Sequence, residues 1–155
     1  MYLFYLLRCG MSRELYDNMN LENQLCFPLY AASREVIKAY RPYLEKLELT
    51  YTQYITMVVL WEEKRISAKE LGKKLFLDSG TLTPVLKSLE GKGLVTRSRF
   101  PEDERVLLVE VTEEGYALKE TASGIPEKVS FGINLGSEDM YKLYELLYKL
   151  LGSFE

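Results

Sequence analysis

With 155 residues, of which 47% are hydrophobic and 28% charged, the chain has the size and composition of one globular domain that can bury a core. The net charge of −3 gives no overall basic signal for a nucleic-acid partner. Histidine is absent, which excludes His-dependent catalytic triads and His-based metal sites, and we expect neither a metal nor a cofactor.

The N-terminal stretch "MYLFYLLRCG" is apolar, but it is too short to span a bilayer and lacks the features of a signal peptide. Because Met11 and Met19 follow it, we interpret residues 1–20 as a peripheral extension that is poorly ordered or lies upstream of the natural start. We expect no membrane association. Cys9 and Cys26 make no disulfide framework and fit a reducing cytoplasm, where we place the protein.

The next segment predicts two helices. The first has apolar residues at helical spacing, namely Leu25, Leu29, Val36, Tyr40, Tyr43 and Leu47. Pro42 should kink or break this helix, because a proline removes one backbone hydrogen bond. The apolar run "YITMVVLWEE" then predicts a buried second helix.

Two capped helices follow. Ser67 and Glu70 form a capping-box pattern at the start of "ISAKELGKKLF". After the turn "LDSG", either Asp78 or Ser79 can cap a further helix, "TLTPVLKSLEGKG", which the closing glycines should end. That helix should begin around residue 80, so that Pro84 lies near its first turn.

The remaining chain predicts a β-hairpin and two helices. The runs "LVTRSRF" and "VLLVEVT" flank a charged tip, "PEDER", and Thr112 caps the helix after them. The last helix, within residues 137–154, has a wider apolar face than one subunit needs. This order predicts a mainly α protein with a small β-hairpin wing, a winged helix-turn-helix.

We therefore divide the single domain, residues 21–155, into two functional regions. Residues 63–112 form the predicted DNA-binding lobe, while residues 21–62 and 113–155 supply terminal dimerisation and sensing helices. Residues 63–105 carry ten basic and seven acidic side chains, a local charge of +3 that leaves −6 for the rest of the chain. One face can therefore attract phosphate.

The candidate DNA contacts lie on the second capped helix and on the hairpin. They are Ser79, Thr81, Thr83 and Lys87 on the helix, and Arg97, Arg99, Asp103 and Arg105 on the hairpin. The helix hydroxyls can donate to phosphates or reach base edges, and an arginine at the hairpin tip can enter the minor groove. Asp103 can hold the fork of Arg105. The alternative is that the hydroxyls cap the helix, the lysines form a solvated face and the hairpin carries an ordinary salt bridge.

Cys26 lies beside the predicted start of the first helix, because Pro28 suits a first helical turn. The positive end of the helix dipole there favours a thiolate, yet a lone cysteine is also commonly a small buried hydrophobe. Tyr30, four residues on, shares its helix face. Tyr40 is four turns away, about 21 Å along the helix, so only an antiparallel partner helix can bring it to Cys26.

Two stretches resemble a known family. "LDSGTLTPVLKSLEGKGLVTRSRFPEDERVLLVEVTEEG" is similar to the recognition helix and wing of MarR-family repressors. "LENQLCFPLYAASREVIKAYRPYLEKLELTYTQY" resembles the organic-hydroperoxide-sensing OhrR-type branch. The resemblance implies a homodimer that binds an inverted-repeat operator in double-stranded DNA. It also implies a sensor role for Cys26, hydrogen bonds to it from Tyr40 and Tyr51 of the other subunit, and a supporting role for Tyr30.

The mechanism implied by the resemblance is derepression. An organic hydroperoxide oxidises Cys26 to a sulfenic acid, and the repressor then leaves its operator. No cysteine follows Cys26, which matches the one-cysteine branch, where a low-molecular-weight thiol or a backbone nitrogen captures the sulfenate. The open alternatives are a thiol peroxidase, a repressor governed by a small phenolic ligand, a global regulator of redox or virulence genes, and a protein-interaction module. We expect the protein not to be an enzyme.

Overall fold

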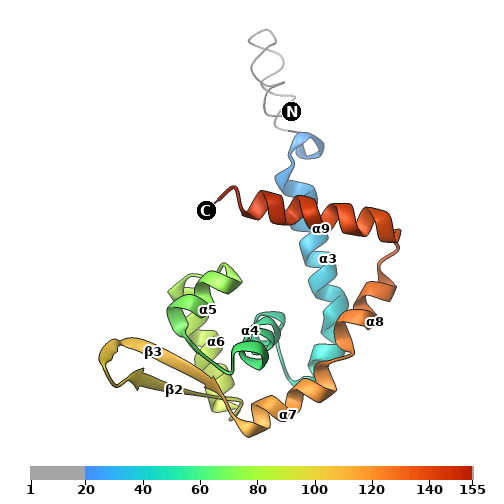
Figure 1. The fold of residues 1–155 in the computed structure, drawn as a ribbon. Helices are drawn as coiled ribbons and strands as arrows, with labels where there is room; N and C mark the ends of the chain where they lie inside the picture. The colour runs from blue at the N-terminus through green and yellow to red at the C-terminus, as the bar shows by residue number, and fades with distance from the viewer. Residues whose placement is uncertain (1–19, 155) are drawn as a thin grey trace, which may run out of the picture. The chain divides into compact units, whose positions relative to one another are not determined.

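The computed structural model describes residues 20–154, and the predictions made for Cys9 and for residues 1–19 lie outside them. The described chain runs η1 (Leu21–Asn23), α3 (Cys26–Leu44), η2 (Glu45–Leu47), α4 (Tyr51–Glu63), β1 (Arg65–Ser67), α5 (Ala68–Leu75), α6 (Ser79–Gly91), β2 (Val95–Phe100), β3 (Asp103–Val111), α7 (Glu113–Ala122), α8 (Ile125–Gly132) and α9 (Ser137–Leu151). The mainly α fold with a small β wing is confirmed (Figure 1). The chain separates into two compact units at Arg41/Pro42, inside α3.

Helix α3 has little core of its own. It begins at Cys26, close to the predicted start, and Leu44 is its buried residue. Of the two effects predicted for Pro42, a kink or a break, the break does not occur, because α3 continues through Pro42 to Leu44. A proline there costs the bond from its own position to the carbonyl of Lys38, and one missing bond near a C-terminus does not end a helix of 19 residues.

The core of the second unit forms around α4. Thr50 and Gln53 build a full capping box at its start. From inside the helix, Met57 and Leu60 are fully buried. The indole of Trp61 donates a hydrogen bond of 2.7 Å to the carbonyl of Gly115, which ties α4 to α7. The core continues into the neighbouring elements with Leu71, Leu82, Leu86, Leu89, Val95 and Val109, all buried.

The wing belongs to a three-stranded antiparallel sheet of order β1-β3-β2. The sequence pattern missed β1, whose Ile66 pairs with Val109 of β3. The hairpin of β2 and β3 projects beyond α5 and α6 (Figure 1). Its tip is shorter than predicted: Phe100 pairs with Asp103, so three charged residues assigned to the tip belong to β3. The pairing register of β2 with β3 shifts between Arg99 and Phe100.

The C-terminal helices leave from the base of the sheet. Thr112 caps α7, as predicted, by accepting a hydrogen bond from the backbone N–H of Gly115. Helix α8 was not predicted. Helix α9 has no buried residue among those described, and Tyr141, Leu146 and Tyr148 are more than half exposed. None of the described helices is long and apolar enough to cross a membrane.

Candidate nucleic-acid interface and sensor cysteine

Each helix of the helix-turn-helix, α5 and α6, begins at an N-cap. Ser67 accepts a hydrogen bond from the backbone N–H of Glu70 at 3.1 Å, and its hydroxyl donates to the Glu70 carboxylate at 2.7 Å. Phe76 ends α5 in the left-handed conformation, with φ of 53°. Asp78 then caps α6, which begins at Ser79, one residue before the predicted start. This is the helix-turn-helix geometry that the capping pattern indicated.

The two threonines of α6 both use their hydroxyl hydrogens inside the protein. Thr81 donates through its Oγ1 to Asp78 Oδ2 at 2.9 Å, and through its backbone N–H to Asp78 Oδ1 at 2.9 Å. These bonds hold the pKa of Asp78 below its usual range. Thr83 donates to the carbonyl of Ser79 at 2.6 Å. Both side chains are exposed, as are Ser79 and Lys87.

At the wing, Asp103 grips Arg105, the arrangement expected from the sequence. The Arg105 guanidinium donates to both carboxylate oxygens of Asp103, at 2.9 and 3.1 Å, and its backbone N–H adds a third bond at 3.0 Å. The side chain of Arg105 is nevertheless 90% exposed. These bonds lower the pKa of Asp103. The carboxylate thus fixes an extended arginine in place without covering it.

Arg97 has a different environment from the other two arginines of the hairpin. Its guanidinium donates two hydrogen bonds to the Glu90 carboxylate of α6, at 2.5 and 3.0 Å, and its side chain is only 19% exposed. This pair braces β2 against α6 and covers most of Arg97, whose contact with DNA stays a prediction. Arg99 is exposed on the same strand.

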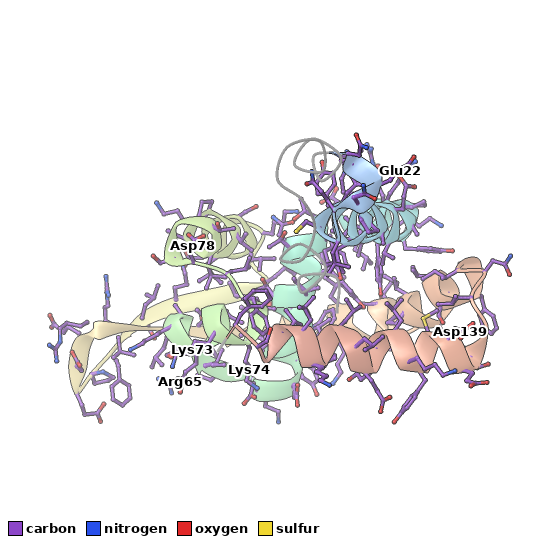
Figure 2. All side chains as sticks on the ribbon, turned by 90° about the horizontal axis from the view of Figure 1, so that it is seen from above. Glu22, Arg65, Lys73, Lys74, Asp78 and Asp139 are labelled. Carbon is purple, nitrogen blue, oxygen red and sulfur yellow. The ribbon has the colours of Figure 1, made fainter. Side chains whose placement is uncertain are left out.

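A groove of about 1050 Å³ lies between α5, α6 and β3, which sequence reasoning missed. Its lining includes Lys69 and Lys73 of α5, Ser79 of α6, and Arg105 of β3. Figure 2 shows Lys73 on α5 and Asp78 at the start of α6. The spacing of four between Lys69 and Lys73 already places them on one face of α5. That this face lines a groove depends on the position of β3, which the sequence does not give.

Cys26 is the first residue of α3, and its side chain is exposed. The residues that the structure describes therefore leave this thiol exposed and not in their hydrophobic core. On the same helix, Arg34 donates a hydrogen bond of 2.8 Å to the Tyr30 hydroxyl and lies 5.5 Å from the centre of its ring. The sequence did not single out Arg34.

The other two candidate tyrosines are partly buried. Burial raises the pKa of Tyr40 above its ordinary value, so its phenol remains protonated at neutral pH. Tyr51 is the first residue of α4, and its ring lies 6.5 Å from that of Tyr54. A phenol hydroxyl can donate one hydrogen bond, which is the role that the family resemblance gives to both tyrosines.

Comparison with known proteins shows that the chain is similar to bacterial transcriptional regulators. Residues 38–122 match the family described as "Transcriptional regulator SarA/Rot". The organic hydroperoxide resistance transcriptional regulator of Bacillus subtilis is 50% identical to this chain over 88% of it and 92% of that protein. The HTH-type transcriptional regulator SarZ of Staphylococcus haemolyticus is 44% identical over 86% of this chain and 90% of its own.

Solved structures give the same result. AbfR of Staphylococcus epidermidis is 35% identical, with a TM-score of 0.71, over 90% of this chain and 97% of its own. The reduced form of AbfR has been solved bound to DNA, with a TM-score of 0.72 to this chain. These relatives are regulators, so the thiol-peroxidase alternative is wrong and the protein is not an enzyme. The chain therefore belongs to the MarR family of winged-helix transcriptional regulators, in its one-cysteine OhrR-type branch.

Proposed function

We propose that the protein is a homodimeric, cytoplasmic repressor that binds an inverted-repeat operator and releases it when an organic hydroperoxide oxidises Cys26. The observation that carries this proposal is the exposed thiol at the first residue of α3. A helix start favours the thiolate, which is the nucleophile in peroxide chemistry. The similarity to a regulator of organic hydroperoxide resistance supports the choice of oxidant.

The chemistry needs only the peroxide and a small thiol. The Cys26 thiolate attacks one oxygen of the hydroperoxide, the O–O bond breaks, and the leaving alkoxide takes a proton to become an alcohol. The cysteine is now a sulfenic acid. A low-molecular-weight thiol then displaces water from it and forms a mixed disulfide. The added bulk lies at the start of a helix and shifts the spacing of the two DNA-binding lobes relative to the half-sites.

The apolar surface of α9 supports the homodimer. This helix of 15 residues has none buried among those described, and several of its leucines and tyrosines are exposed. Burying such a face against a second copy is the usual solution for a soluble protein. In that dimer, we propose that Tyr40 and Tyr51 donate hydrogen bonds to the Cys26 thiolate of the other subunit, and that Tyr30 supports it.

The decisive experiment compares operator release by the wild type and by Cys26→Ser. Both should bind the operator when reduced, because serine keeps the size of the side chain. Cumene hydroperoxide should release the wild type and leave Cys26→Ser bound, because a hydroxyl cannot be oxidised to a sulfenic acid. Cys9→Ser is the matched control and should respond like the wild type. Release of Cys26→Ser at the dose that releases the wild type would refute the sensor assignment.

A second candidate signal is a small phenolic acid. The groove beside α5 and α6 favours it, because apolar walls and the cations Lys69, Lys73 and Arg105 suit an aromatic carboxylate. Salicylate would then release Cys26→Ser and the wild type equally. Release by salicylate without any response to peroxide would favour this candidate over the redox sensor.

A further inference from the structure

The outward face of α6 is poor in hydrogen-bond donors over its first two turns. Each residue advances about 100° around a helix, so Gly80 and Pro84 lie opposite the three buried leucines of α6, with Thr81 and Thr83 on either flank. Glycine and proline have no polar side-chain atom. Around Gly80 and Pro84, side-chain hydrogen bonds to DNA bases therefore depend on Thr81 and Thr83.

The hydroxyl hydrogen of Thr81 is already used. The Asp78 carboxylate is ionised at neutral pH, because its pKa is lowered by the bonds from Thr81, and an ionised carboxylate can only accept hydrogen bonds. The 2.9 Å contact from Thr81 Oγ1 to Asp78 Oδ2 must therefore run from the hydroxyl to the carboxylate. What Thr81 offers to a ligand is its oxygen lone pairs and its methyl group.

Thr83 is constrained in the same way. Its Oγ1 lies 2.6 Å from the carbonyl oxygen of Ser79, and a carbonyl can only accept. Both threonines thus present an acceptor oxygen and a methyl group, and neither presents a donor. Beyond them on this face, the next cation is Lys87.

Base edges in the major groove differ in what they require. Guanine shows two acceptors, N7 and O6, and is read by donors. Adenine and thymine each show one acceptor, N7 or O4, but adenine and cytosine also show an amino group, which needs an acceptor, and thymine shows a methyl group, which needs an apolar contact. The two threonines match the second group of edges and not guanine.

We infer that Thr81 and Thr83 are specificity-determining residues that select thymine methyl groups and base amino groups, and that Asp78 sets this preference by holding the Thr81 proton. The inference rests on the proposed function, in which α6 enters the major groove of the operator. The base groups that α6 recognises are then thymine methyl groups and base amino groups, and a measurement of overall operator affinity does not distinguish them from other contacts.

The test uses full-length reduced protein and a duplex selected by binding from a random pool. Each thymine of that duplex is replaced in turn by deoxyuridine, which removes only the methyl group. Affinity should fall about fourfold at one or more thymines in each half-site, the factor expected for one buried methyl group. Thr81→Ser or Thr83→Ser should lose affinity for the thymine duplex and not for the deoxyuridine duplex. Thr121→Ser, on α7, is the control and should match the wild type on both.

A second variant tests the role of the carboxylate. In Asp78→Asn the side-chain oxygen still caps the Thr81 N–H, while the amide nitrogen donates to Thr81 Oγ1 and turns its proton outward. This variant should gain relative affinity for duplexes with guanine at the affected position. Equal affinity for every deoxyuridine duplex, with normal binding of the parent, would overturn the inference and leave the repressor intact. Failure to enrich any duplex would instead overturn the proposed function.

Discussion

Two arginines of the hairpin have different environments: one is paired inside the protein and the other is exposed at the wing. Arg105 is held by Asp103 at the wing and is 90% exposed, whereas Arg97 is largely covered and paired with Glu90. We expect Arg105→Ala to weaken operator binding and to lower the slope of log affinity against log salt by about 0.9, the effect of one lost phosphate contact. Its melting temperature should match the wild type.

Arg97→Ala serves as the contrasting variant. It leaves Glu90 without its partner at the contact of β2 with α6, so thermal unfolding should occur at a lower temperature. Calorimetry and fluorescence anisotropy on both variants separate the two roles. Loss of DNA affinity in a fully stable Arg97→Ala protein would support the predicted DNA contact of this residue.

Gly115 is a position where only glycine fits. A Cβ there would lie 2.0 Å from the carbonyl oxygen of Leu94, and the carbonyl of Gly115 accepts the Trp61 indole. Gly115→Ala should therefore destabilise the protein by about 3 kcal/mol or more, through forced movement of buried backbone. Gly132→Ala, where a Cβ would meet nothing within 4 Å, is the control and should change stability by less than about 0.5 kcal/mol. Chemical denaturation of both variants measures the difference.

At the scale of elements, α3 and the start of α4 carry the proposed sensor. Tyr40, whose pKa is raised by burial, lies on α3, and Tyr51 is the first residue of α4. We expect Tyr40→Phe and Tyr51→Phe each to slow oxidation of Cys26 about tenfold, as loss of a hydrogen bond to a charged group implies, while operator binding by the reduced protein persists. Stopped-flow oxidation with cumene hydroperoxide measures the rate. Unchanged rates in both variants would assign these tyrosines to packing.

Elements with local signals were predictable, and those that depend on distant partners were not. The caps of α5, α6 and α7 follow from side chains that bond within three residues. Ser67 and Thr112 were therefore predicted from the sequence, and Asp78 was one of two candidates beside Ser79. Strand β1 has three residues and exists because β3, more than forty residues away, pairs with it. Helix α8 has eight residues and starts at Ile125 without a side-chain cap. Neither leaves a periodic pattern long enough to detect.

The candidate site shows the same division. The grip of Asp103 on Arg105 spans two residues and was foreseen, whereas the pairing of Arg97 with Glu90 depends on how β2 packs on α6. Arg97 and Arg99 are indistinguishable in sequence, since both are arginines on the same face of one strand. Only the fold shows that one of them is covered.

At the scale of the whole molecule, the exposed face of α9 is the feature to test. We expect Leu143→Glu and Leu147→Glu to convert a dimer into a monomer at micromolar concentration, because a charge on this face opposes burial against a second copy. Operator affinity should fall with it, since one lobe reaches only one half-site. Sedimentation velocity gives the oligomeric state, with Lys149→Gln on the same helix as the control. A monomeric wild type would refute the homodimer.

Ser67 has two structural duties, as the last residue of β1 and the N-cap of α5. Opening the sheet at β1 would therefore also remove the cap of the helix-turn-helix, so neither element can open without the other. The amides of β1, of its partner positions in β3 and of the first turn of α5 should then share one free energy of opening in native-state hydrogen exchange. If so, β1 and the first turn of α5 lose their order in a single step, and a substitution that opens β1 also disturbs the helix-turn-helix.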